Sequence, residues 1–301
     1  MTEQQAKKIL YILTSLAIVL SVLAAFIFTM YHHSLYYKLG TCKEYYDVSK
    51  KADSDEITVM SFNIHGFTTA DRKEKSYYTR APLMIKLIKE NEPDIINFQE
   101  TGNFEELFFK AHLLGYTFIN SKSGLVTAFR NDRFSLLEYG KFWLSDTPDV
   151  ESFGWDAACI RTALYSYILD NKTNKTYTIT NTHLDHVGEQ ARINGIKLIL
   201  EKMESLSSGT MILCGDMNDF VGGEMYEEAT KTLNDAQLVA KNTYLGPGAT
   251  YHSYGRILKN ARIDYFFLTP DIEINSYIVI DRTFDGIYPS DHFPILMKIA
   301  Q

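Results

Sequence analysis

The sequence predicts an α+β domain of two packed sheets with helices outside, preceded by one helix that spans a membrane. Short apolar or alternating runs recur from residue 57 to the C-terminus, and helical patterns separate only some of them. An uncharged apolar run of helical length lies near the N-terminus. The 301 residues, 46% hydrophobic and 22% charged, suffice for one large folded domain.

The N-terminal apolar run extends from Ile9 to Tyr31, and a bilayer requires about 20 residues at helical rise. Lysines precede the run, and tyrosines and histidines follow it, as at a membrane interface. A signal peptide has a shorter apolar stretch of about 7–15 residues. Residues 9–31 are therefore predicted to be a single-pass membrane anchor.

The orientation of this anchor is predicted from its flanks. Lys7 and Lys8 favour an N-terminus in the cytoplasm and a following domain that is extracytoplasmic or lumenal. Two glycosylation-type triplets, at residues 171–173 and 174–176, fit that location.

We divide the chain into an N-terminal tail and anchor (1–35), a polar, tyrosine-rich linker (36–55) and a folded domain (56–301). Helices are expected at 81–91, 104–114 and 189–206, where apolar residues recur at helical spacing. Strands are expected at 57–64, 95–98, 116–120, 125–129, 160–169, 177–182, 211–214, 263–268, 277–280 and 295–299.

The charge of the chain argues against one class of partner. Residues 1–51 carry six lysines and three acidic residues, a net charge of +3. Because the whole chain has a net charge of −7, residues 52–301 have a net charge of −10. Tight binding of duplex nucleic acid usually requires a basic surface and is not expected here. A phosphorylated substrate is still compatible, because a bound metal ion supplies local positive charge. The three cysteines show no paired spacing, and Cys159 and Cys214 are predicted to be small buried hydrophobes.

Polar side chains gather where the predicted strands end, which is where a sheet presents functional groups. Six strings stand out: Ser-Phe-Asn-Ile-His-Gly (61–66), Asn-Phe-Gln-Glu-Thr (97–101), Asn-Thr-His-Leu-Asp-His (181–186), Leu-Cys-Gly-Asp-Met-Asn-Asp (213–219), Ala-Arg-Ile-Asp-Tyr-Phe-Phe (261–267) and Tyr-Pro-Ser-Asp-His-Phe-Pro (288–294). Each alone is weak, because Asp-x-Asn is a common turn and a lone histidine is more often structural.

Together the strings supply hard oxygen ligands and imidazoles. Carboxylate and amide oxygens favour Mg²⁺, Mn²⁺ or Ca²⁺ over zinc, and the His183–His186 spacing lacks a third zinc ligand. Histidines with nearby carboxylates suit proton transfer. A metal, an acid/base pair and amide donors are the parts that phosphoester hydrolysis requires.

In their order and spacing these strings resemble the endonuclease/exonuclease/phosphatase superfamily, whose fold is that of pancreatic deoxyribonuclease. The match runs from Ser61 to Pro294. The resemblance implies a four-layer α/β/β/α sandwich with one active site between the sheets. It also implies a phosphoester hydrolase that uses Mg²⁺ or Mn²⁺.

The resemblance assigns roles to single residues. Glu100 corresponds to the principal metal ligand, Asn63 to the amide that orients the metal or the phosphate, and Asp291 to a second carboxylate near the metal. His65 departs from relatives that carry an aspartate two residues after the asparagine, so a second metal held by a carboxylate is in doubt.

The remaining roles concern the water and the phosphate. Asp216 and Asn218 correspond to the pair that aligns the attacking water and the phosphate, His292 to the imidazole beside the water, and Asp264 to the carboxylate that orients it. His183 corresponds to the imidazole that contacts the phosphate or protonates the leaving oxygen, and Arg161 to a phosphate-binding arginine. Trp155 either stacks on a base or sugar of the substrate or packs in the domain.

Three functions remain open on the sequence. The charge favours a phosphodiesterase or phosphatase that acts on a small or lipid-borne phosphoester. The alternative is an endo- or exonuclease on RNA or DNA. A binding module without catalysis is disfavoured, because such a module has no need to keep the whole ligand set.

Overall fold

The computed structural model describes residues 2–206, 210–257 and 259–300. The chain divides into two compact units, residues 1–43 and 44–301. The first unit is dominated by one long helix, α1 (Glu3–Gly40). Within it, Glu3–Phe26 is long and apolar enough to cross a membrane, at about 36 Å for a rise of 1.5 Å per residue. The large apolar side chains from Ile9 to Phe26 in this unit are solvent-exposed.

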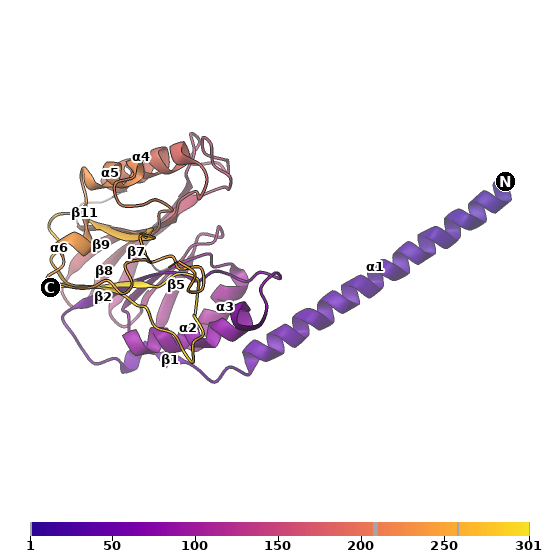
Figure 1. Cartoon of the computed structure of the whole chain (residues 1–301), viewed down its shortest axis with the longest axis horizontal. Helices are drawn as coiled ribbons and strands as arrows, with labels where there is room; N and C mark the ends of the chain where they lie inside the picture. Colours follow the sequence, from indigo (N-terminus) through magenta and orange to yellow (C-terminus); the bar gives the residue numbers. More distant parts are fainter. Residues whose placement is uncertain (1, 207–209, 258, 301) are drawn as a thin grey trace. The chain divides into compact units, whose positions relative to one another are not determined.

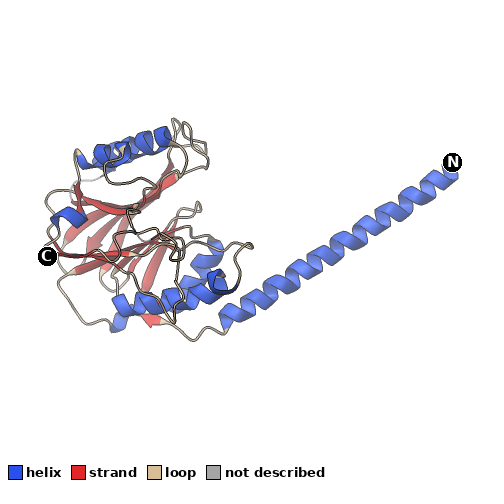
Figure 2. Cartoon of the chain, in the orientation of Figure 1, coloured by secondary structure: helices blue, strands red, loops and turns tan. Residues whose placement is uncertain are grey.

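The second unit contains two large sheets that face each other, each with helices on its outer side (Figures 1 and 2). The seven-stranded sheet has the order β12-β14-β15-β2-β3-β6-β5. Its strands are β2 (Ile57–Asn63), β3 (Ile95–Gln99), β5 (Tyr116–Asn120), β6 (Val126–Arg130), β12 (Asn242–Tyr244), β14 (Ile274–Val279) and β15 (Ile295–Ile299). Helices α2 (Tyr77–Asn91) and α3 (Asn103–His112) lie on its outer side.

The six-stranded sheet has the order β11-β13-β10-β9-β8-β7. Its strands are β7 (Phe134–Trp143), β8 (Thr162–Asp170), β9 (Lys175–His183), β10 (Thr210–Asp216), β11 (Asn234–Asp235) and β13 (Asp264–Leu268). Helices α4 (Glu189–Leu206) and α5 (Glu224–Thr230) cover its outer side (Figure 1). The short elements are β1 (Tyr46–Asp47), β4 (Leu113–Leu114), α6 (Ala236–Val239) and the 3-10 turns Val48–Lys50 and Lys73–Lys75.

Two apolar cores hold these layers together. The first lies between the sheets, where Ile57 and Val59 of β2 belong to one buried cluster with Ile179 of β9 and Phe266 of β13. The second packs Ile196 of α4 and other apolar residues of α4 and α5 against the six-stranded sheet. The observed α/β/β/α layers confirm the predicted four-layer fold.

The structure corrects the predicted linker, the predicted burial of one cysteine and the predicted end of the helix at 104–114, since that helix ends at His112 and Leu113–Leu114 form β4. The predicted linker, residues 36–55, starts within α1, and Tyr46–Asp47 within it form β1, which pairs with β4 inside the folded unit. Cys159 is exposed rather than buried, because it lies in a loop before β8, whereas Cys214 in β10 is buried as expected.

The register of the strands explains how the site forms. His183, Asp216 and Asp264 are direct neighbours across β9, β10 and β13. In the other sheet, Asn63 pairs with Gln99, next to Glu100, and Ile295 of antiparallel β15 pairs with Ser61. Site residues therefore lie at the C-terminal ends of parallel strands and at the start of antiparallel ones, so that they gather at the same end of the strands in each sheet.

Arg133 joins the two sheets at the opposite end of the strands. Its buried guanidinium donates to Asp170 at the end of β8 and to the carbonyls of Ser54, Asp55 and Glu56 before β2. Removing one partner of a buried ion pair leaves an uncompensated charge in the interior.

We expect Arg133→Met to lower the unfolding free energy of residues 44–301 by about 3–5 kcal/mol, measured by urea denaturation and tryptophan fluorescence. Lys172→Ala, which removes a cation that pairs with the exposed Asp53 and Asp55, is the control and should leave the transition unchanged. Equal stability of Arg133→Met and the wild type would contradict a stabilising role for this guanidinium.

Candidate active site

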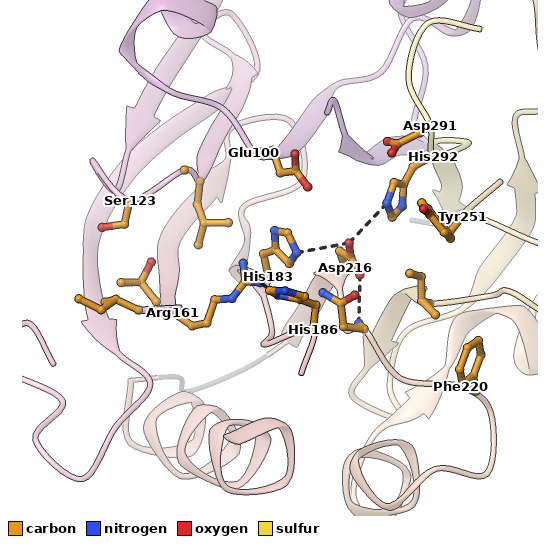
Figure 3. A pocket seen from close by; sticks show the side chains of 16 residues that line it. Glu100, Ser123, Arg161, His183, His186, Asp216, Phe220, Tyr251, Asp291 and His292 are labelled. Atoms are coloured by element: carbon orange, nitrogen blue, oxygen red, sulfur yellow. Dashed lines mark hydrogen bonds and ion pairs between the residues drawn. The ribbon is translucent and has the colours of Figure 1, made fainter. Parts of the chain in front are cut away.

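A cavity of about 670 Å³ opens between the sheets at the edge where the predicted residues meet (Figure 3). Its lining includes most of the predicted site residues, namely Glu100, Arg161, His183, Asp216, Asn218, Asp291 and His292. Asn63 and Asp264 are buried beside it and bond to residues of its wall. Trp155 is half-buried and is not among the lining residues, so the structure does not bring it to this cavity.

Gly215 allows β9 and β10 to approach each other closely at this edge. Its φ is +140°, and a Cβ there would lie 1.9 Å from the carbonyl oxygen of Thr182 in β9. Glu100 and Asn218 also have positive φ values of 55° and 49°. Such backbone strain in non-glycine residues is typical of functional sites.

Asp264, His292 and Asp216 form a buried chain of polar contacts. His292 Nδ1 lies 2.9 Å from Asp264 Oδ2, and His292 Nε2 lies 3.6 Å from Asp216 Oδ2. Burial alone would lower the pKa of His292, but the negative charges of Asp264 and Asp216 outweigh it and raise this pKa well above the usual value. Burial raises the pKa of Asp216. The chain is thus able to accept and hold a proton.

Asn63 organises the carboxylates beside this chain. Its Nδ2 donates to Asp216 Oδ2 at 2.9 Å and to Glu100 Oε1 at 3.1 Å, while its oxygen accepts the backbone N–H of His65. In this orientation Asn63 positions Glu100 and Asp216 rather than offering its oxygen to an ion.

His65 lies beside Asp291 on the same side of the site. His65 Nδ1 is 3.1 Å from Asp291 Oδ2, and its Nε2 is 2.9 Å from Asp71 Oδ2. Burial would raise the pKa of Asp291, but the hydrogen bond from His65 and nearby positive charges lower it to about 2. Asp291 is therefore ionised at neutral pH, as a ligand of a divalent cation must be.

His183 and Arg161 line the side of the cavity that belongs to β8 and β9. Burial, followed by the positive charge of Arg161, lowers the pKa of His183 well below its usual value. A neutral imidazole donates one hydrogen bond but carries no spare proton, which favours contact with a phosphate over protonation of a leaving oxygen. Figure 3 shows the His183 ring turned toward Asp216, and the two side chains approach to 3.4 Å.

Asp185 holds Arg161 in place. Its carboxylate accepts backbone N–H groups on both sides, from Ala158 and Cys159 and from Val187 and Gly188. Burial opposes this charge, but these hydrogen bonds lower the pKa of Asp185. Arg161 Nε lies 3.5 Å from Asp185, and its guanidinium contacts His186 at 3.2 Å.

Three groups of the described residues could hold a metal ion, and the first, Cys159 with Asp185 and His186, lies beside Arg161. The ligand atoms of Asp216, Asp264 and His292 lie close enough to one another to hold a metal ion. Their atoms, however, are already engaged with one another, with Asn63 and with the Asn218 N–H. Glu100 and Asp291 are the carboxylates that face the cavity beside that chain (Figure 3), and their oxygen ligands suit Mg²⁺ or Mn²⁺.

Several functional contacts were not predicted from the sequence. Ser123, His186 and Phe220 line the cavity, and Arg80 donates a hydrogen bond to the Ile64 carbonyl in a loop of the site. His186 was considered only as a zinc ligand. Phe220, two residues beyond the Asp216–Asn218 pair, carries no chemical signal of its own. Tyr251 also lines the cavity.

Arg80 is fully buried and fastens two loops of the site together. Its guanidinium donates to the carbonyls of Ile64 and His65, which follow β2, and to that of Pro289, which precedes Asp291. Because the bonds go to backbone atoms far apart in the sequence, no local pattern reveals this role.

Comparison with known proteins shows the family to which the chain belongs. The sequence matches the Endonuclease/Exonuclease/phosphatase family over residues 60–292. Protein L388 of Acanthamoeba polyphaga mimivirus is 28% identical over 269 residues, which cover 80% of this chain and 99% of that protein.

Solved structures give the same result. An endonuclease/exonuclease/phosphatase family protein from Bacteroides thetaiotaomicron is 28% identical, with a TM-score of 0.77 over 81% of this chain and 94% of its own. A mannosyl-6-phosphatase from the same organism is 28% identical, with a TM-score of 0.76 over 81% of this chain and 100% of its own. The human nocturnin catalytic domain is 21% identical and shares the fold, with a TM-score of 0.61 over 83% of this chain and 96% of its own.

Proposed function

Because the chain belongs to the endonuclease/exonuclease/phosphatase family, we propose that it is a divalent-metal-dependent hydrolase of small or lipid-borne phosphoesters. The observation that carries the proposal is the Asp264–His292–Asp216 chain, which lies beside Glu100 and Asp291 in one cavity. A proton-accepting group and carboxylate ligands for a cation thus surround a space that a phosphate group fits.

The chain's own residues account for most of the chemistry. Asp264 fixes the ring of His292 through Nδ1, so that Nε2 faces the cavity beside Asp216. A water molecule held between His292 and Asp216 would pass its proton to the Asp216 carboxylate and attack the phosphorus in line, while the bond from phosphorus to the ester oxygen breaks and the leaving oxygen takes a proton from solvent. Asn218, His183 and Arg161 stabilise the negative charge that develops on the phosphate oxygens.

Glu100 and Asp291 would hold the metal ion. When bound, a divalent cation neutralises charge on the phosphate and on the leaving oxygen. The low pKa of Asp291 and the placement of Glu100 by Asn63 support this assignment.

The form and charge of the cavity support a compact substrate. Its volume of about 670 Å³ falls within the range of small-molecule sites. Arg161 is the one Lys or Arg among the residues that line it, whereas a nucleic-acid groove carries many phosphate contacts. Similarity to a mannosyl-6-phosphatase supports a phosphatase activity on a small ester.

This proposal predicts little dependence on salt. With Mg²⁺ or Mn²⁺ present, we expect the full-length protein to cleave phosphomonoesters or small phosphodiesters at rates that change less than about twofold between 50 and 200 mM salt. Proteins that contact many phosphates lose roughly 10³–10⁵ in affinity over that range. Efficient cleavage of duplex DNA or RNA with such a steep loss would establish the nuclease alternative.

We also propose that α1 anchors the protein through residues 9–31, with the catalytic unit extracytoplasmic or lumenal. The exposed apolar side chains of this helix support the proposal, because soluble proteins rarely expose so large a continuous apolar surface to water.

The anchor is tested by fractionation. Full-length protein should remain in membranes after carbonate extraction, and deletion of residues 1–43 should release a soluble, active unit. Protease added to intact cells should digest the catalytic unit. Recovery of the full-length protein in the soluble fraction, or a mature N-terminus after residue 31, would contradict an uncleaved anchor.

A further inference from the structure

A second hollow of about 400 Å³ adjoins the catalytic cavity. Phe220 lines both spaces. Two further segments contribute to both spaces. Thr250 lines the hollow and the next residue, Tyr251, lines the cavity; likewise Arg262 lines the hollow and Ile263 lines the cavity. The hollow therefore lies next to the site, on the side opposite Arg161, where Figure 3 shows Phe220 and Tyr251.

Half of the residues that line the hollow are apolar, with Val221, Leu245, Ala249 and Val279 beside Phe220, while Gln237, Thr250 and Asn260 are polar and uncharged. The one charged residue among its described lining is Arg262. Its guanidinium is paired with the buried Asp235 and stacks on the Tyr265 ring at 4.5 Å from the centroid. The charge of Arg262 is thus compensated inside the protein, and the hollow offers no free charge to an ionic ligand.

Hydrogen bonds fix the backbone around Phe220, although 55% of the residue is exposed. Asp219 accepts the backbone N–H groups of Phe220 and Met225, and the carbonyl of Phe220 accepts the N–H of Gly223. Tyr265 donates to the Asp219 carbonyl. An exposed aromatic ring on a fixed turn, between two cavities, is typical of a ligand contact rather than of a mobile loop.

We propose that this hollow binds the alkyl chain of a lipid phosphate ester whose phosphate occupies the catalytic cavity. The inference rests on the proposed function and names its substrate class. An apolar wall without a free charge complements an uncharged chain, and Phe220 places the first methylene groups next to the phosphate. The apolar helix α1 is consistent with a lipid substrate, because an enzyme anchored in a membrane meets its lipid substrate in the same bilayer.

The test uses full-length protein in phosphatidylcholine nanodiscs with Mg²⁺, and ethyl, butyl and hexyl phosphate as substrates. We expect kcat/KM to rise by up to about fourfold for each added methylene group that leaves water. Phe220→Ser and Leu245→Ser should each reduce the hexyl-to-ethyl ratio at least tenfold. Leu137→Ser, which alters an equally apolar and half-exposed position on β7 outside both spaces, should keep the wild-type ratio.

Further measurements separate the possible failures. Binding of hexylphosphonate, measured by calorimetry, should weaken in parallel in the two hollow variants and not in Leu137→Ser. Equal kcat/KM along the series, with ethyl phosphate cleaved, would overturn the inference and leave the proposed function standing. Cleavage of hexyl phosphate but not of hexadecyl phosphate embedded in the nanodisc would overturn the lipid source. No hydrolysis of any ester would overturn the proposed function and this inference with it.

Discussion

Replacing Glu100 with glutamine should lower kcat/KM by about a thousandfold, and a chelator should abolish turnover in the wild type until Mg²⁺ or Mn²⁺ is restored. The substitution keeps the shape of the side chain and the bond to Asn63 but removes the charge that a cation requires. A bound metal ion contributes several kcal/mol of transition-state stabilisation, and about 1.36 kcal/mol corresponds to a factor of ten in rate.

The assay compares Mg²⁺ titrations of the two proteins with a small phosphoester. Glu100→Gln should require more metal for half-maximal activity as well as turn over slowly. Glu90→Gln is the matched control, since Glu90 pairs with Arg282 on the surface of the domain away from the cavity. Full activity of the wild type in chelator would refute the metal-dependent mechanism.

The second large effect is expected at Asp264. Asp264→Asn keeps the volume but replaces the charged acceptor of His292 Nδ1 with a neutral amide whose nitrogen is able to donate instead, so the tautomer and orientation of the imidazole are no longer fixed. In other enzymes, loss of such a carboxylate costs up to roughly ten-thousandfold in kcat. We expect a loss in kcat of at least about a thousandfold here, with a smaller change in KM because Asp264 is buried and does not line the cavity.

Steady-state kinetics with saturating Mg²⁺ provides the measurement, and circular dichroism verifies the fold of the variant. Asp281→Asn is the control, because Asp281 bonds to Tyr244 outside the catalytic cavity. An Asp264→Asn enzyme with near-normal kcat would show that His292 needs no partner and that another group positions the attacking water.

The helices of the domain show how accurately local sequence patterns predict the bounds of a helix. The helix predicted at 189–206 has the observed bounds of α4, because its apolar spacing is regular and it packs on one face. The helix predicted at 81–91 starts earlier, at Tyr77. Proline favours the first turn of a helix, so local rules place the start near Pro82. The buried contacts of Tyr77 and Arg80 extend it by a further turn.

The residues that the structure brings together in the cavity could be predicted from the sequence, because each belongs to a short string at a strand end. Their roles could be predicted less well. Asn63 could be assigned near the metal, but only the folded structure directs its amide nitrogen to Glu100 and Asp216. Likewise, Trp155 is a plausible stacking residue in the sequence, yet it is not among the residues that line the cavity.

The sequence by itself determined the fold class, the apolar N-terminal helix and the set of carboxylates, amides and imidazoles, because these depend on periodicity and on local strings of residues. Tertiary structure alone decided which of these groups touch. The contact of His65 with Asp291, the Arg80 clamp and the hollow beside Phe220 join residues that are distant in the chain. Such contacts arise from the packing of two sheets, which brings separate strand ends to one edge and which no local pattern encodes.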